Sequence, residues 1–346
     1  MRDVIKPDWL AKKLWYVEVG KEEDGMSKKA KVMTSGGVEV RQKPMKLRIW
    51  QNRGYYLMFL PVLVFLLIIY YWPMLGIRYA FYNYKPVGTP TFVGWENFQK
   101  MFATSAFWIA FKNTLILSVA KLLITTFASV IVSIFLNEMG NLFAKKTLQT
   151  VIYLPHFMSW AVTASIFSLL LSPSSTGMIN GWLRDLGVLT DADKNIYFLA
   201  SSSWWRPIFY IVNLWKETGW GTIIFLATLS GINPELYEAA DIDGATRMQK
   251  INYVTVPALA NTIITVLILN LAKVMNLFES VFVLYNNAVY DVSDVISTYV
   301  YRQTFAVALP NYGYSTAVGL FKSLVGCILV LICNWASKKT RGRGIV

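Results

Sequence analysis

Six long runs of apolar side chains divide the chain, and polar stretches separate them. Each run reaches or approaches the roughly 20 residues that an α-helix needs to cross a bilayer. We therefore predict an all-α integral membrane protein whose chain crosses the membrane six times. The fourth run is the weakest, because Lys216, Glu217 and three glycines interrupt it. The predicted spans are about 57–81, 113–136, 148–171, 208–232, 254–284 and 315–336.

The most polar stretch of the second half lies between the fourth and fifth predicted spans. Asn233 is suited to cap the first free amides of a helix, and Pro234 suits the first helical position. Glu235 and Glu238 then lie near the positive end of the helix dipole. Gly244 lets the chain turn or lets another backbone approach closely. Composition alone leaves two interpretations open, a helix held by something outside the membrane and an ordinary solvated loop.

The same stretch carries a resemblance to a known family. Three residues separate Glu238-Ala239-Ala240 from Gly244, and twelve more lead to Pro257. This resembles the EAA loop of ABC importer permeases, which is written E-A-A, three residues, G, nine residues, I-x-L-P. Val254 and Val256 stand at the two aliphatic positions of that pattern and keep its apolar character. The longer matches of residues 237–246 and 92–98 resemble the branch that imports oligosaccharides.

The resemblance, which covers roughly residues 53–337, implies a six-helix type I ABC importer permease bundle with a cytoplasmic coupling helix. It implies a second, homologous permease subunit in a probable heterodimer, two ATP-binding subunits below, an extracytoplasmic solute-binding protein above, and an oligosaccharide substrate. The coupling helix of such permeases docks into a cleft of the ATPase subunit. The residues that the resemblance assigns to ATPase coupling are Glu238, Ala239, Ala240, Asp241, Gly244, Ala245 and Pro257.

Two domains are predicted. Residues 1–54 form a basic N-terminal tail with thirteen Lys or Arg, and residues 55–340 form the membrane domain, in which 233–253 is the coupling loop. The tail reads as mostly disordered, although two basic amphipathic pieces, at 9–15 and 47–50, are suited to lie on the membrane surface. We expect no cleavable signal peptide, because the first apolar run starts too far into the chain.

The distribution of positive charge predicts the orientation. If the N-terminus is cytoplasmic, the inner segments hold 21 of the 33 lysines and arginines and the outer segments hold eight. This excess predicts that both termini and the coupling loop face the cytoplasm of a bacterial cell, across its plasma (inner) membrane. It also accounts for the net charge of +13 without a nucleic-acid partner.

Composition and motifs exclude several other classes. Hydrophobic residues make up 55% of the chain, which is too high for a soluble protein of this length. Walker A, Gly-x-Ser-x-Gly and His-Glu-x-x-His patterns are absent from the sequence, as is metal-ligand spacing, so we expect no enzyme, metal or bound cofactor. ATP hydrolysis must come from a partner. A polytopic glycosyltransferase and a secondary transporter stay open as alternatives, as does a permease for another solute class.

Charged side chains inside the predicted spans are candidates for the substrate pathway, because charge in a span usually faces protein or water. The competing interpretation is that their heads reach the outer interface, which is plausible for Lys216 and Lys273 and poor for Lys121. If two of the lysines line a cavity, its positive field favours an acidic, uronate-containing oligosaccharide over a neutral one. The candidates are Lys121, Lys216, Glu217, Lys273 and Lys322.

Aromatic residues make up 15% of the chain. Belts at the two membrane interfaces explain most of them, but sugar rings also stack on aromatic faces. Composition does not separate these two roles. The only histidine, His156, follows a proline near the start of the third span and is expected to be a packed or interfacial residue rather than a catalytic one.

Overall fold

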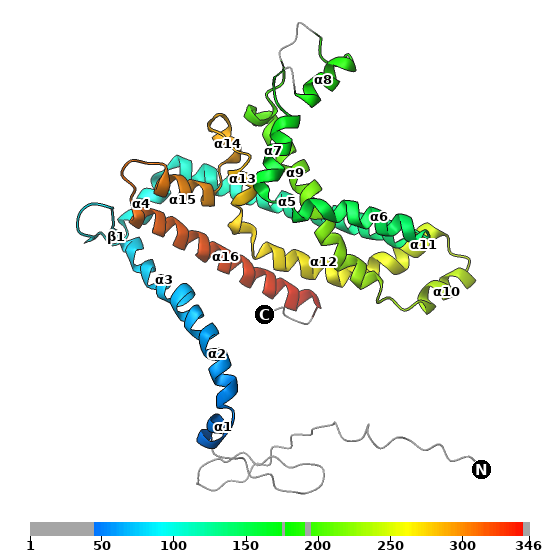
Figure 1. The fold of residues 1–346 in the computed structure, drawn as a ribbon, viewed down its shortest axis with the longest axis horizontal. Coiled ribbons are helices and arrows are strands. Elements are labelled where there is room, and N and C mark those ends of the chain that lie inside the picture. The colour runs from blue at the N-terminus through cyan, green and yellow to red at the C-terminus, as the bar shows by residue number, and fades with distance from the viewer. Residues whose placement is uncertain (1–44, 175–176, 191–194, 342–346) are drawn as a thin grey trace. The chain divides into compact units, whose positions relative to one another are not determined.

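The computed structural model describes residues 45–174, 177–190 and 195–341 (Figure 1). Most of the predicted tail, residues 1–44, therefore lies outside the described residues. The chain divides into two compact units, Met1–Met74 and Leu75–Val346. The described part of the first unit contains α1 (Met45–Gln51), α2 (Arg53–Leu66), a π-helical turn (Leu67–Tyr71) and α3 (Trp72–Met74).

The second unit begins with a 3-10 helix, Leu75–Phe81, and a two-stranded antiparallel ribbon of β1 (Tyr82–Asn83) and β2 (Thr91–Phe92). Helices then follow one another to the end of the described chain. They are α4 (Glu96–Ala103), α5 (Ser105–Asn137), α6 (Leu142–Tyr153), α7 (Trp160–Leu170), α8 (Met178–Asp185), α9 (Ser202–Leu229), α10 (Glu235–Ile242), α11 (Arg247–Lys250), α12 (Val256–Leu271), α13 (Glu279–Phe282), α14 (Tyr290–Ser293), α15 (Ile296–Phe305) and α16 (Tyr312–Arg341). Short 3-10 helices Leu154–Phe157, Phe198–Ala200, Val274–Asn276 and Asn287–Val289, and a π-helical turn Ile251–Thr255, lie between them.

Four helical segments among the described residues are long and apolar enough to cross a membrane: Arg53–Phe81, Ser105–Asn137, Arg247–Leu271 and Tyr312–Lys339. A fifth candidate is the pair Leu142–Phe157 and Trp160–Leu170, which is bent by 102° at its break. The third predicted span, 148–171, therefore coincides with a bent pair of helices and not with one straight helix. Hydropathy reports how apolar a segment is and not whether it is straight.

The weak fourth run forms α9, a continuous helix of 28 residues. It does not count among the apolar spans, and its position explains why. α9 packs along α5, where Ser129 Oγ donates to the carbonyl oxygen of Thr218 over 3.0 Å. A Cβ at Gly219 would lie 2.1 Å from the carbonyl oxygen of Ile152, so the α9 and α6 backbones approach closely there. A helix covered by protein on several sides tolerates polar residues better than one that faces lipid.

The fifth predicted span, 254–284, is too long. The helix that starts at Arg247 ends at Leu271, and the chain then continues as short helical turns up to α15. Lys273, predicted on the outer half of this span, thus lies beyond the end of the helix and is exposed.

Two prolines in long helices, Pro73 and Pro257, are each preceded by a π-helical turn. The amide of the residue just before Pro73 donates to the carbonyl oxygen of Leu67, and the amide just before Pro257 donates to that of Ile251. Each of these hydrogen bonds spans five residues, as in a π-helix, and not the four residues of an α-helix. A proline ring clashes with the carbonyl four residues earlier in a regular α-helix, so widening the preceding turn lets the helix continue past it.

The two ends of α5 hold two different polar regions of the second unit. Near its start, Asn113 Nδ2 donates to the carbonyl oxygen of Asp291 in α14 over 3.0 Å. Just past its end, Glu138 binds Arg247 of α11. A helix of 33 residues is about 50 Å long, so these regions lie on opposite sides of a bilayer-sized layer. Figure 1 shows the same separation, with α10 and α11 at one end and α4 and α15 at the other.

Candidate functional site

The predicted coupling helix is present as α10, but it begins one residue later than predicted. Pro234 occupies the cap position, and Asn233 precedes it. The Asn233 side chain still serves the helix start, since Oδ1 accepts from the amide of Glu235 over 3.2 Å and Nδ2 donates to Glu235 Oε2 over 3.0 Å. The first turn also carries Glu238, so two carboxylates face the positive end of the helix dipole.

The far end of α10 explains the spacing between the alanines and the glycine. Gly244 has φ +73°, the left-handed conformation that suits glycine. Its amide donates to the carbonyl oxygen of Asp241 over 3.1 Å, and the amide of Ala245 donates to that of Ala240 over 2.9 Å. These two bonds form a Schellman motif, which requires the glycine four residues after Ala240.

Three contacts tie this loop to the long helices. Lys250 Nζ lies 2.7 Å from Asp241 Oδ1, and Tyr237 Oη lies 3.0 Å from Thr255 Oγ1 at the start of the fifth span. Arg247 Nε lies 2.5 Å from Glu138 Oε2, and the same guanidinium donates to the Glu138 carbonyl oxygen. The loop is thereby fixed to α5 and to α12.

The outer surface of the loop is exposed in this chain. Glu238 and Ala239 are exposed, and so are several apolar side chains: Leu236, Ile242, Met248 and Tyr253. Ile242, directly before the turn, is 88% exposed. Pro257 lies apart from this surface, in the first turn of α12. Leu236 and Ile242 belong to α10, and exposed apolar side chains on a polar, capped helix are typical of a protein-binding surface.

Lys216, predicted to reach the outer interface or to line the pathway, is buried in this chain. It is 3% exposed, and its ammonium donates to three backbone carbonyl oxygens, those of Pro155 (3.3 Å), His156 (3.1 Å) and Met158 (2.5 Å). These carbonyls belong to the break between α6 and α7. A helix end leaves carbonyl groups without partners, and Lys216 satisfies them from the neighbouring helix.

Glu217, the next residue of α9, belongs to a second set of contacts at the same break. Its Oε2 lies 3.5 Å from Nδ1 of His156. The His156 ring stacks on Trp220, with 4.6 Å between centroids and 9° between planes. His156 is therefore packed, in line with the interpretation of its sequence context.

Lys121 shares Trp160 with Lys216. Its Nζ lies 5.7 Å from the centre of the Trp160 ring, and that of Lys216 lies 5.2 Å from it. Unlike Lys216, the half-buried Lys121 ammonium has no hydrogen bond or ion pair with any described residue. The Glu217 carboxylate attracts the Lys121 ammonium electrostatically, without a direct ion pair.

The remaining lysines lie elsewhere. Lys322 Nζ donates to Ser297 Oγ over 3.1 Å and so connects α16 to α15. Lys273 lies past the end of α12. The structure therefore brings together Lys121, Lys216 and Glu217 but not the whole set.

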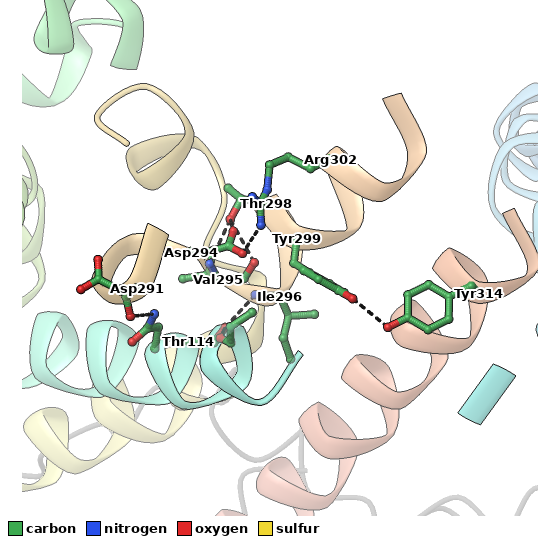
Figure 2. A network of polar contacts seen from close by, with 11 residues as sticks. Thr114, Asp291, Asp294, Val295, Ile296, Thr298, Tyr299, Arg302 and Tyr314 are labelled. Carbon is green, nitrogen blue, oxygen red and sulfur yellow. Dashed lines mark hydrogen bonds and ion pairs between the residues drawn. The ribbon is translucent and has the colours of Figure 1, made fainter. Parts of the chain in front are cut away.

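Sequence reasoning missed a polar network that anchors the α14–α15 segment, which Figure 2 shows. Buried Asp294 binds Arg302, and Thr298 Oγ1 donates to Asp294 Oδ1 over 2.7 Å. The amide of Ile296 donates to Thr114 Oγ1 of α5 over 2.9 Å. Burial raises the pKa of the Asp294 carboxyl, while Thr298 and Arg302 act in the opposite direction. The four-residue spacing of Asp, Thr and Arg was the signal that could have indicated this network.

The membrane-length helices, the close packing of α9 and the capped exposed loop fit a membrane permease subunit. Residues 129–342 match the family described as "Binding-protein-dependent transport system inner membrane component", and the chain belongs to this family. Its members are transport components and not enzymes. The predicted fold class, a type I ABC importer permease, is confirmed. The relatives give no support to the glycosyltransferase alternative.

Three similar proteins place the chain within the family. It is 37% identical over 309 residues to the "Polygalacturonan/rhamnogalacturonan transport system permease protein YteP" of Bacillus subtilis (strain 168), covering 88% of this chain and 94% of that one. It is 38% identical to "Protein LplB" of the same organism, covering 85% and 92%. A crystal structure of "a bacterial ABC transporter involved in the import of the acidic polysaccharide alginate" matches with a TM-score of 0.78 and 36% identity, covering 86% and 99%.

The contrast between the two lysines beside Trp160 gives a stability prediction. We expect Lys216→Met to cost about 2–4 kcal/mol, because three carbonyl oxygens lose their bond to a buried charged donor. Lys121→Met should cost less than about 1 kcal/mol, since no hydrogen bond is lost. Thermal unfolding of the purified permease complex, with equal membrane insertion as the control, measures both. Equal melting temperatures for the two variants would contradict the structural role of Lys216.

Proposed function

We propose that this chain is the membrane-spanning subunit of an ABC importer and forms the translocation pathway for an oligosaccharide. The observation that carries the proposal is the capped, exposed α10, whose shape fits the docking element of such permeases. Similar proteins are described as transporting polygalacturonan or rhamnogalacturonan, arabinooligosaccharides and alginate, which supports a saccharide substrate. A permease for another solute class is the alternative.

The partners follow from this role. Two ATP-binding subunits hydrolyse ATP, a second homologous permease completes the pathway, and a solute-binding protein delivers the substrate from outside. A related alginate transporter has been crystallised "in complex with alginate pentasaccharide-bound periplasmic protein", which supports the last of these. This chain itself needs no metal or cofactor for the proposed role.

Mechanical coupling would pass through the contacts of the loop. When the ATPase subunits close, they displace α10, whose exposed Glu238 faces a basic residue of the ATPase. Tyr237 and Thr255 transmit the displacement to the start of the fifth span, and Arg247 and Glu138 transmit it to the end of α5. Because α5 also holds the α14–α15 segment, movement at one end reaches the other, and the pathway alternates between inward-facing and outward-facing states.

Two substitutions in the loop test the coupling role. Gly244→Val forces a β-branched residue into φ +73°, at a cost of about 1–3 kcal/mol, and disturbs the end of α10. Glu238→Lys reverses the charge that faces the ATPase. We expect each to reduce uptake by roughly tenfold or more while the protein remains inserted. Gly140→Val is the matched control, since Gly140 is an exposed loop glycine with open space around it. Normal uptake by both test variants would refute the role.

We further propose that both termini and the coupling loop face the cytoplasm. The support is the excess of positive charge on these segments and the separation of the two polar regions along α5. The α8 and α14–α15 segments would then lie on the outer side.

Single-cysteine labelling tests this orientation. A membrane-impermeant maleimide should label cysteine placed at exposed Pro90 or Asp185 in intact cells. Cysteine at Lys145 or Thr246 should react only after the membrane is permeabilised. Labelling of position 246 from outside intact cells would show that the orientation is reversed.

The finer substrate hypothesis is an acidic, uronate-containing oligosaccharide. Two of the similar transporters carry names of acidic polysaccharides, polygalacturonan and alginate. In this chain, the Lys121 and Lys216 ammonium groups both lie beside the Trp160 ring, and Glu217 is a carboxylate near enough to attract Lys121. Two lysines share one carboxylate there, so a carboxylate of the substrate would supply the second negative charge.

A charge-specific comparison tests this hypothesis. In the full complex, Lys121→Gln should lower ATPase stimulation by a uronate oligosaccharide roughly tenfold and leave stimulation by a matched neutral oligosaccharide unchanged. Lys121→Arg, which keeps the charge, should retain most of the wild-type response. Equal stimulation by both sugars, unaltered in Lys121→Gln, would show that the lysine is a structural residue.

A further inference from the structure

The segment that follows α12 carries six aromatic rings in continuous contact. The rings of Phe278 and Phe282 stack with 5.0 Å between centroids, and Phe282 meets Tyr301 of α15 at 4.8 Å. Tyr301 continues to Phe305 at 5.2 Å. From Phe282 a branch runs through two more tyrosines, with steps of 5.7 and 5.3 Å. We call this set the aromatic ladder: Phe278, Phe282, Tyr285, Tyr290, Tyr301 and Phe305.

In this segment small aliphatic side chains are buried and large aromatic rings are partly exposed, which is the reverse of the pattern that packing alone predicts. The smaller aliphatic side chains between the rings, Val281, Leu284 and Val289, are at most 4% exposed. All six rings of the ladder keep part of their surface exposed, and Phe305 is 73% exposed. Burying a large aromatic ring gains more than burying a valine, so an ordinary core would hide the rings first. A contiguous aromatic surface left open marks a binding site.

The hydrocarbon core of the bilayer does not fit this surface. Residues 272–295 run as short turns with breaks between them, and backbone of this kind does not face the hydrocarbon core. It occurs only where it is covered by protein or lines a water-filled cavity. Lys273 and Glu279, both exposed, flank the first ring and indicate water. The ladder also carries three phenolic hydroxyls, of which those of Tyr285 and Tyr290 are hydrogen-bonded to each other.

The backbone that carries the ladder is held firmly. Arg302, next to Tyr301, binds Asp294 and lies 4.0 Å from the centre of the Tyr290 ring (Figure 2 shows the Asp294–Arg302 pair). Thr114 anchors the start of α15 to α5. Rings on a fixed backbone, supported by their neighbours, lose little conformational entropy when they bind a ligand.

From these observations we propose that the aromatic ladder is a stacking surface for the pyranose rings of the transported oligosaccharide. This inference rests on the proposed function. The C–H faces of sugar rings pack on aromatic faces, and the tyrosine hydroxyls bind sugar hydroxyls. Recognition at the ladder depends on ring faces, whereas recognition at Lys121 depends on charge. The two sites therefore make separate contributions to the same passage.

Photo-labelling tests the ladder directly. The full complex in nanodiscs, with its ATPase subunits and binding protein, is supplied with diazirine-bearing oligosaccharides in matched neutral and uronate forms. Labelled peptides are then mapped by mass spectrometry. We expect label on residues 278–305. Tyr301→Leu, which removes the ring at the centre of the ladder, should lower both labelling and uptake roughly threefold to tenfold, the range of an aromatic contact.

Two variants separate sugar stacking from a structural role of the rings. Tyr301→Phe keeps the ring and should retain most of the labelling, and Phe135→Leu removes an exposed ring of α5 outside the ladder and should change nothing. Import of the neutral sugar alone would refute the acidic substrate but not the ladder, which should then bind that sugar. Label elsewhere with normal import, or unchanged behaviour of Tyr301→Leu, would overturn the ladder proposal. So would loss of the partner permease in Tyr301→Leu, which would assign these rings to the subunit interface.

Discussion

The ammonium group of Lys216 binds the carbonyl oxygens at the break between α6 and α7, and the arrangement of the second unit depends on that contact. Without it, a turn of 102° would leave polar backbone groups unpaired inside an apolar bundle. Lys216 comes from α9, which packs along α5 and approaches the α6 backbone at Gly219. A single buried charge therefore connects the bent pair to α9, which packs along the long helix α5 of the second unit.

Polar contacts hold the neighbouring segments at both ends of α5, and these contacts differ between the two ends. At one end, ion pairs and a hydroxyl pair hold α10 and α11 close to the long helices while leaving their outer surface open. At the other end, Asp294, Arg302 and Thr298 make a compact network that keeps the aromatic ladder in place. The second unit thus has an exposed capped loop near one end of α5 and an exposed aromatic surface near the other, joined by one continuous helix.

The positions of the helices and the coupling loop could be predicted from the sequence, because apolar runs and capping residues are local signals. The break near His156 could not, since hydropathy does not register direction. The role of Lys216 depends on carbonyls about 60 residues earlier in the chain, and such pairing is invisible without the fold. The end of α12 at Leu271 was missed because the apolar run continues past it. The coupling and pathway roles stay predictions.

The order in which the segments are synthesised determines when the Lys216 contact can form. Residues 142–170 leave the ribosome before Lys216 does, so the carbonyl oxygens at the break have no ammonium partner while this pair first meets the membrane. An unpaired break is costly in hydrocarbon, so the bent pair can settle only when α9 arrives beside it. Insertion of the third and fourth segments is therefore coupled. In a chain truncated before residue 216, the bent pair would lack its ammonium partner and would meet the membrane quality-control machinery in that state.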